Sequence, residues 1–129
     1  ARLEDADPYV RRHARLMLDR LDRDGRLQDV QPDPIQVWRL GSGLTLVAMG
    51  GEVVVDYALR LARDYAGQRL WAAGYSNDVF GYVPSLRVLR EGGYEGGDAM
   101  IYYARPGPFN ERVEELIVAK IHQLTGGRS

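Results

Sequence analysis

The stretch WAAGYSNDVFGYVPSLRVLREGGYEGG, residues 71–97, decides the fold of this 129-residue chain. Its opening residues, 71–74, are small or apolar and predict a buried strand, whereas the segment 75–78 carries turn-forming side chains that cannot continue a sheet. A short helical run separates Tyr82 from Tyr94, and glycines surround both. A chain keeps glycine at this density where its backbone turns sharply or approaches something closely. We therefore interpret the stretch as a strand followed by a site built at the strand's end.

The composition indicates one globular domain with a real core. Hydrophobic residues make up 45% of the chain, and a chain of this length is large enough to bury them. The formal net charge is -1 and basic residues alternate with acidic ones, so we expect no nucleic-acid partner. The chain has no cysteine, which excludes disulfides, thiolate catalysis and Cys-ligated zinc. No apolar run approaches the ~18 residues of a membrane span, so no transmembrane segment is expected.

The residues before the opening stretch predict a helix, a hairpin and a second helix. Asp7 and Pro8 are typical of a helix start, and apolar residues at helical spacing continue that helix to residue 22. The segments 35–40 and 44–49 predict two strands joined by a Gly-rich turn, with the less polar second strand deeper in the sheet. Helical spacing returns over 53–65.

The complete pattern predicts a single α/β domain, residues 1–129, in which helices pack on a small mixed sheet. After the hairpin, the predicted helices and strands alternate along the chain. The strands are expected at 35–40, 44–49, 69–75 and 99–104, and the helices at 8–22, 53–65, 85–90 and 110–124, with Asn110 as the cap of the last helix.

Glu52 follows two glycines at the junction of a predicted buried strand and the next helix. One interpretation is structural, because a carboxylate at a helix N-terminus is favoured by the helix dipole. The other is functional, because open α/β sheets bind ligands beyond the carboxyl ends of their strands. If the strand-helix-strand unit makes the two strands parallel neighbours, Glu52 and Tyr82 share a pocket, with Tyr94 at its border. Both interpretations stay open on the pattern alone.

Neither histidine lies in a recognisable metal-binding pattern. His13 lies among charged residues of the first helix without a partner at helical spacing, and we expect it at the surface or an edge. His122 lies near the end of the last helix, where a favourable dipole interaction explains it. We assign no metal or catalytic role to either residue.

Three pieces of the chain, in this order, resemble the neutral, non-lysosomal ceramidases and their bacterial relatives. Gly50-Gly51-Glu52 is similar to the family's Pro-Gly-Glu. AGYSNDVFGYVP, residues 73–84, is similar to its Ala-Gly-x-x-Asn…Tyr-Val/Ile-Thr segment, and Gly93-Tyr94-Glu95 is similar to its Arg-Tyr-Glu. The resemblance covers roughly residues 44–97 and weakens toward both ends.

Enzymes of this family hydrolyse the amide of ceramide to sphingosine and a fatty acid, with one zinc held by two histidines, a glutamate and a tyrosine. The resemblance implies that Glu52 matches the glutamate ligand and Tyr82 the tyrosine ligand. It implies that Tyr94 matches a tyrosine that stabilises the oxyanion of the tetrahedral intermediate. The chemistry agrees, because zinc lowers the pKa of bound water to roughly 7 and one oxyanion donor typically contributes ~3 kcal/mol.

The family's histidine ligands lie upstream of the matching region, and neither histidine of this chain matches their motifs. The resemblance therefore implies a C-terminal part of a larger ceramidase-like protein, whose partners are the upstream part of the same polypeptide and a lipid amide substrate. It implies zinc in the complete protein and poor zinc binding by this chain alone. Gly50 in place of proline and Pro84 in place of threonine imply a divergent branch. The alternative is a non-catalytic α/β binding or accessory module that retains the fold.

Overall fold

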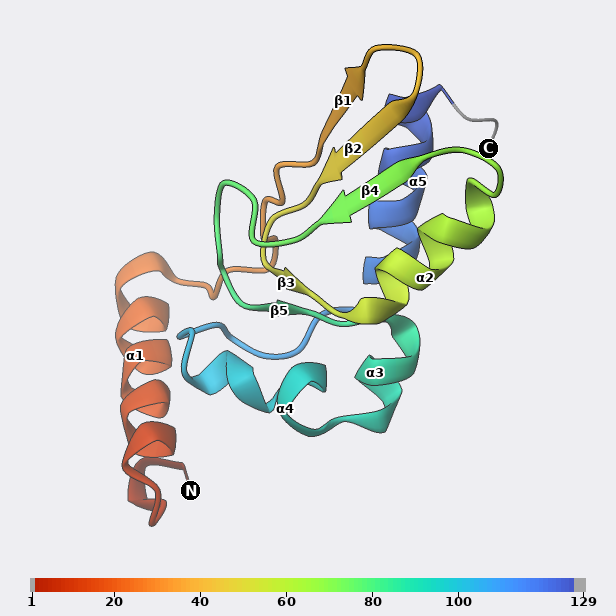
Figure 1. The fold of residues 1–129 in the computed structure, drawn as a ribbon. Coiled ribbons are helices and arrows are strands. Elements are labelled where there is room, and N and C mark those ends of the chain that lie inside the picture. The colour runs from red at the N-terminus through yellow and green to blue at the C-terminus, as the bar shows by residue number, and fades with distance from the viewer. Residues whose placement is uncertain (1, 127–129) are drawn as a thin grey trace.

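The computed structural model describes residues 2–126, and its larger sheet has the strand order β1-β2-β4. Strands β1 (Gln36–Leu40) and β2 (Leu44–Ala48) are antiparallel, whereas β2 and β4 (Leu70–Ala73) are parallel and are connected through helix α2 (Val55–Asp64) (Figure 1). The predicted α/β class, the mixed sheet and the hairpin are confirmed. The less polar strand β2 is central, as its composition predicts.

A second, smaller sheet pairs β3 (Glu52–Val53) with β5 (Tyr82–Val83) in parallel. The sequence analysis did not predict these two short strands. The expected helix start at residue 53 is therefore wrong, because Val53 lies opposite Val83 in this sheet and α2 begins only at Val55. β-branched valines favour this extended conformation over the first turn of a helix.

Two of the four predicted helix starts, those of α1 and α3, agree with the structure. The side chain of Asp7 caps α1 (Pro8–Asp24) by accepting a hydrogen bond from the Tyr9 N–H at 2.8 Å. Ser85 caps α3 (Leu86–Glu91) by accepting from the Val88 N–H at 3.2 Å. Asn110, in contrast, does not cap α5 (Val113–Thr125), because it accepts from the Arg112 N–H at 3.0 Å in the turn before that helix.

The predicted strand at 99–104 is wrong. Helix α4 (Gly93–Gly96) and the 3-10 helix η2 (Asp98–Ile101) lead into a tight turn here, and another 3-10 turn, η1 (Arg2–Glu4), precedes α1. The Tyr102 N–H donates to the Ala99 carbonyl at 2.9 Å, so the backbone bonds are local. Ala99 and Met100 are buried. A short apolar run is typical of both a buried strand and a buried helical turn, since periodicity does not separate the two.

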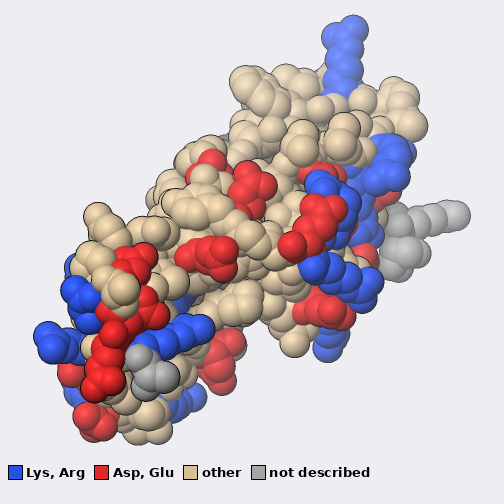
Figure 2. All heavy atoms as spheres, turned by 90° about the horizontal axis from the view of Figure 1, so that it is seen from below, with Lys and Arg blue, Asp and Glu red and all other residues tan. Residues whose placement is uncertain are grey.

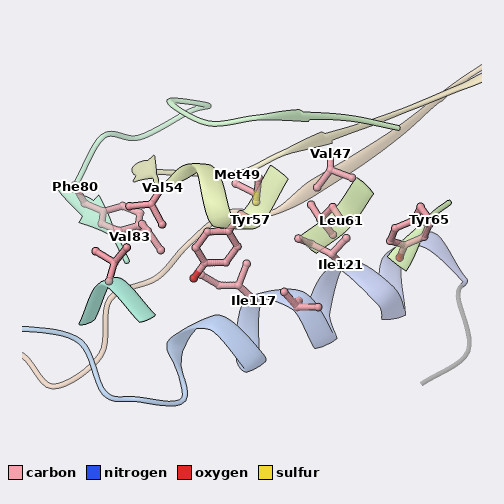
Figure 3. Packing of buried hydrophobic residues seen from close by; sticks show 12 residues of the cluster. Val47, Met49, Val54, Tyr57, Leu61, Tyr65, Phe80, Val83, Ile117 and Ile121 are labelled. Atoms are coloured by element: carbon pink, nitrogen blue, oxygen red, sulfur yellow. The ribbon is translucent and has the colours of Figure 1, made fainter. Parts of the chain in front are cut away.

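The core lies between the inner face of the three-stranded sheet, α2 and α5 (Figure 3). Each of these layers contributes side chains with 0% exposure: Val47 and Met49 beside the sheet, Tyr57 and Leu61 from α2, and Ile121 from α5. Burial of such side chains is the main favourable contribution to folding. The apolar packing therefore holds the end of β2, and with it Glu52, in one position.

Polar contacts connect the same elements at their edges. The hydroxyl of Tyr57 donates to the Pro84 carbonyl at 3.1 Å, which ties α2 to the chain after β5. The guanidinium of Arg60 contacts the carboxylates of Glu114 and Glu115 at 2.9 and 2.6 Å, which ties α2 to α5. The first contact holds the chain after β5 against the core, and the second holds α2 against α5.

Helix α1 lies at one end of the molecule, away from the three-stranded sheet (Figure 1). His13 is its buried residue, only 5% exposed, so the expected surface or edge position is wrong. The His13 Nε2 lies 2.6 Å from the Arg105 carbonyl oxygen, and Arg20 donates to the Ala104 carbonyl at 2.6 Å. α1 is thus attached to the turn after η2 through these two polar contacts.

The charged side chains of both signs are interspersed on the face that Figure 2 shows, with neither sign gathered over a whole element. This agrees with the formal net charge of -1. Among residues 2–126, no helix combines the length and the apolar character that a membrane crossing requires.

Replacement of Leu61 by alanine tests the core. Leu61 has 0% exposure on α2, so Leu61→Ala should lower the free energy of unfolding by about 2–5 kcal/mol, through lost burial and the cavity left behind. Leu59, on the same helix, is 58% exposed, and Leu59→Ala should change stability by less than about 0.5 kcal/mol. Urea unfolding followed by circular dichroism measures both. Equal losses would contradict the packing described.

Candidate functional site

The site begins with the pairing of β3 and β5. Glu52 and Tyr82 are register partners in this parallel pair, and the Glu52 N–H donates to the Gly81 carbonyl at 2.8 Å. Register partners on adjacent strands point to the same face of a sheet, with backbones about 4.8 Å apart. The carboxylate and the phenol are thus neighbours although 30 residues separate them in the sequence, from 82 minus 52.

Gly51 makes this approach of the two segments feasible. Its φ is +65°, and a Cβ at this position would lie 2.6 Å from Val83 Cγ2 and 2.9 Å from the Gly81 carbonyl oxygen. Its N–H donates to the Asp78 carbonyl at 2.7 Å, and its own carbonyl accepts from the Tyr75 N–H at 2.8 Å. Any side chain at residue 51 would therefore separate β3 from β5 and from the loop after β4.

Asp33 supports the same turn and was missed by the sequence analysis. Its Oδ1 accepts a hydrogen bond from the Gly50 N–H at 2.9 Å. Its Oδ2 is the one buried side-chain oxygen or nitrogen in residues 2–126 without a hydrogen-bond partner. Burial raises the pKa of Asp33. The bond excludes a proline at residue 50, which would have no N–H to donate, and a Cβ there would lie only 2.6 Å from the same Asp33 Oδ1.

A row of five tyrosine rings passes the site, and we call it the tyrosine row. The ring of Tyr82 lies 5.4 Å from that of Tyr94 and 6.5 Å from that of Tyr103, with edge-to-face geometry in both pairs. The ring of Tyr102 lies 6.0 Å from Tyr94 and 5.2 Å from Tyr9 on α1. Such offset aromatic pairs are favourable. The row links β5, α4, the turn after η2, and α1.

Tyr75 is a further site residue that the sequence analysis did not single out. It follows β4 with φ +54°, a left-handed conformation that non-glycine residues rarely adopt. Its backbone N–H donates to the Gly51 carbonyl at 2.8 Å, and the Glu52 carboxylate near its hydroxyl raises its pKa. A strained, exposed aromatic residue near a strand end is found more often at functional sites than elsewhere. No feature of the residues 75–78 distinguishes this tyrosine from a turn residue before the structure is known.

The carboxylate of Glu52 changes the acidity of the phenols around it. Hydrogen bonding to Glu52 is the first cause that raises the pKa of Tyr75, to about 12. The pKa of Tyr82 is raised by burial first and by its hydrogen bond to Glu52 second. A negative charge beside a phenol disfavours the phenolate. In the absence of a cation, both phenols therefore keep their protons.

The donor set fits one side of a metal site. A carboxylate and an adjacent phenol offer oxygen ligands that zinc accepts, and a positive ion there would reverse the effect of Glu52 on the phenols. Within residues 2–126, however, no three His, Cys, Asp or Glu residues are grouped so that they could hold a metal ion. A zinc held only by Glu52 and Tyr82 would have fewer than the three protein ligands that catalytic zinc sites normally have.

Of the other residues considered in the sequence, Tyr94 lies at the site and His122 does not. Tyr94 borders Tyr82 as expected, and its side chain is half exposed. Glu52 and Tyr82 are half-buried, so both remain accessible from the surface. His122 is far from this site: its Nε2 lies 3.1 Å from Asp64 Oδ2, and its ring packs on Tyr65.

Comparisons of the chain with models of protein families, with curated proteins and with solved structures found no match.

The contrast between Gly51 and Gly41 tests the close approach. Both have positive φ, +65° and +61°, but a Cβ at Gly41 would meet nothing within 4 Å. Gly41→Ala should therefore cost only the backbone strain, about 1–2 kcal/mol. Gly51→Ala should cost more, because it adds the contacts with Val83 and the Gly81 carbonyl. Chemical denaturation of both variants gives the comparison, and equal costs would argue against the described approach of β3 and β5.

Titration of the tyrosines tests the hydrogen bond between Glu52 and Tyr75. NMR of tyrosine ring carbons should show Tyr75 titrating at about 12, against an ordinary value of 10.0. Because the folded pKa is raised, the stability that this bond contributes is present below pH 10.0 and is lost as the pH rises toward about 12. Glu52→Gln should bring the pKa of Tyr75 back toward its ordinary value. An unshifted Tyr75 in the unchanged protein would show that the carboxylate is not bonded to it.

Proposed function

We propose that this chain carries one side of the active site of a zinc-dependent amide hydrolase of the ceramidase type. The observation that supports this most is the pairing of Glu52 with Tyr82 in β3 and β5, with the ring of Tyr94 at 5.4 Å from that of Tyr82. The family resemblance requires these three side chains to meet, and their spacing in the sequence alone does not bring them together.

The three residues have distinct roles in this proposal. Glu52 and Tyr82 would hold the zinc, which when bound supplies a water molecule that is nucleophilic near neutral pH. Tyr94 would donate a hydrogen bond to the oxygen that becomes negative when the amide carbon is attacked. Its half-exposed position leaves it accessible to a substrate.

The reaction is the hydrolysis of an N-acyl amide, with ceramide or a related lipid amide as substrate. Catalytic zinc sites normally have three protein ligands and one open position. This chain offers two of these ligands, so the remaining ones would come from the upstream part of the same polypeptide. Gly50 and Pro84, where the ceramidases carry proline and threonine, favour a related amide over ceramide itself.

A second candidate is a non-catalytic binding or accessory module with the same fold. The effect of Glu52 on Tyr75 and Tyr82 favours it, because the carboxylate raises the pKa of both phenols and so keeps their protons on them in the absence of a metal. Metal binding separates the two candidates, since only the first requires these phenols to exchange their protons for a cation.

Calorimetric titration of zinc tests the proposal. The 129-residue chain should bind zinc weakly, because two ligands leave the ion half coordinated, whereas the full-length protein should bind one equivalent tightly. Glu52→Ala and Tyr82→Phe should abolish tight binding, and affinity should rise with pH because the metal displaces a phenolic proton. Glu91→Ala, which removes an exposed carboxylate paired with Arg87, is the control and should bind zinc normally. Tight zinc binding by the short chain alone, or by the full-length Glu52→Ala variant, would contradict the proposal.

Release of fatty acid from a labelled N-acylsphingosine, and from N-acyl amides with other head groups, tests the role of Tyr94. In the full-length protein, Tyr94→Phe should lower kcat by about 100-fold, the usual loss of one oxyanion donor, and leave the zinc content unchanged. Tyr9→Phe, at the far end of the tyrosine row, should leave kcat unchanged. Equal activity of both variants would remove Tyr94 from the proposed chemistry.

A further inference from the structure

Glu52 has no positively charged partner among the described residues 2–126. Arginines in this part of the chain pair with carboxylates on or next to α2, α3 and α5: Asp56, Asp64, Glu91, Glu111, Glu114 and Glu115. Glu52 takes part in none of the ion pairs formed within residues 2–126. It is nonetheless half-buried. Because a carboxylate partly removed from water is stabilised by a nearby cation, a cation is favoured at this position.

Neutral tyrosines surround this carboxylate instead. Tyr82 is the register partner of Glu52 in the pair of β3 and β5. Tyr75 is held beside them, because its N–H donates to the Gly51 carbonyl at 2.8 Å and its hydroxyl lies near the carboxylate. Phenols are uncharged near pH 7. The formal charge of this group of side chains is therefore the single negative charge of Glu52.

Two further rings complete the group, which we call the Glu52 cluster: Glu52, Tyr75, Tyr82, Tyr94 and Tyr103. The rings of Tyr94 and Tyr103 lie 5.4 and 6.5 Å from that of Tyr82, both in edge-to-face geometry. Tyr94 belongs to α4, which lies beside β5 (Figure 1). Tyr75 is 58% exposed and Tyr94 is 52% exposed. The Glu52 cluster thus offers ring surface to a ligand that contacts the carboxylate.

The chemistry of the Glu52 cluster favours an organic cation with an apolar part. Carboxylates accept short, charge-assisted hydrogen bonds from N–H cations, and tyrosine rings attract cations through their faces. The rings also have large apolar surfaces that can cover a hydrocarbon chain. An anion would be repelled by Glu52. A neutral apolar molecule would leave the carboxylate without a new contact.

The positions of the oxygen atoms distinguish between kinds of organic cation. The acceptors come from three segments of the chain: Glu52 from β3, Tyr82 from β5, and Tyr75 from the loop after β4. A guanidinium donates in a fixed planar fork that matches one carboxylate, whereas the three N–H groups of an ammonium diverge and rotate. Phenolic oxygens accept hydrogen bonds as well as donate them. A primary ammonium therefore fits these acceptors better than a guanidinium does.

We propose that the Glu52 cluster binds a primary alkylammonium ion, with the ammonium group on the Glu52 carboxylate and the phenolic oxygens, and the alkyl chain along the tyrosine rings. A free alkylamine and a lysine side chain share this chemistry. The inference does not rest on the proposed zinc chemistry, because it requires residues of this chain alone. Zinc and the ammonium ion would compete for the same carboxylate.

NMR titration of the zinc-free 129-residue chain, in buffer with EDTA, tests the inference without any substitution. Butylammonium should cause saturable shifts of the Tyr75, Tyr82 and Tyr94 ring signals. Butanol has the same alkyl chain without the charge and should bind at least about 10-fold more weakly. Tetramethylammonium has no N–H donor and should bind at least about 5-fold more weakly. Equal affinity for either of these molecules and butylammonium would overturn the inference.

A matched pair of variants locates the ammonium group. Glu52→Gln removes the charge and keeps the size of the side chain, so butylammonium should bind at least about 10-fold more weakly. Glu91→Gln removes an exposed carboxylate that is already paired with Arg87, and its affinity should be unchanged. Thermal unfolding shows whether both variants are folded. Equal affinities of the two folded variants would contradict the inference.

A second pair of variants tests the rings, and does so even if Glu52→Gln does not fold. Tyr94→Leu keeps an apolar side chain but removes an aromatic ring, so it should weaken butylammonium binding about 2–5-fold. Tyr9→Leu removes a ring that is similarly exposed, at 54%, on α1 at the far end of the tyrosine row. It should leave the affinity unchanged. Equal losses in both variants would place the alkyl chain elsewhere and overturn the inference.

The remaining outcomes identify the source of the ammonium group and separate the inference from the proposed function. Tighter binding of Nα-acetyl-lysine amide than of butylammonium would support a lysine side chain as the ligand, and weaker binding would support a free amine. Butylammonium binding by the Glu52 cluster of a protein that takes up no zinc would support the inference and contradict the proposed function. Zinc uptake by the full-length protein, with no binding of either amine to the zinc-free chain, would overturn the inference and leave the proposed function standing.

Discussion

The close passage of Gly51 past Gly81 and Val83 is the constraint on which the rest of the site depends. With no side chain at residue 51, the backbone bonds the loop after β4 on both sides, at Asp78 and at Tyr75, and the next residue enters the pair of β3 and β5. A methyl group in this place would meet backbone that cannot move independently, since the chain on either side belongs to the core or to a strand. Glycine here is required by contact as well as by its positive φ.

From that passage follows the chemistry available to the site. Glu52 is held between two phenols, and Tyr82 is in turn held by the rings of Tyr94 and Tyr103. A carboxylate so placed keeps the phenols protonated, whereas a cation bound there would favour their ionisation.

Regular elements with strong patterns could be predicted from the sequence, and so could the proximity of Glu52 to Tyr82, because a parallel strand-helix-strand unit aligns the two strand ends. The strands β3 and β5 could not be predicted, since each has only two residues, too few for any periodicity to show. The strand predicted at 99–104 is wrong because these residues form local turns, beginning with the 3-10 helix η2. Ala99 and Met100 are buried in these turns, and a buried apolar run has the same pattern in a turn as in a strand. Tyr75 reaches the site through its left-handed backbone conformation, and Asp33 reaches it from a loop 17 residues before Gly50. Neither the conformation nor the contact can be recognised in the amino-acid composition. Burial of His13 likewise depends on a contact with Arg105, which is 92 residues away.

Diffraction from crystals of the full-length protein, recorded on both sides of the zinc absorption edge, tests the central claim most directly. The account predicts one anomalous peak at the ends of β3 and β5, with a Glu52 carboxylate oxygen and the Tyr82 phenolic oxygen both at about 2.0–2.2 Å from the ion. A zinc peak that neither Glu52 nor Tyr82 approaches, or no peak in zinc-saturated crystals, would contradict the account.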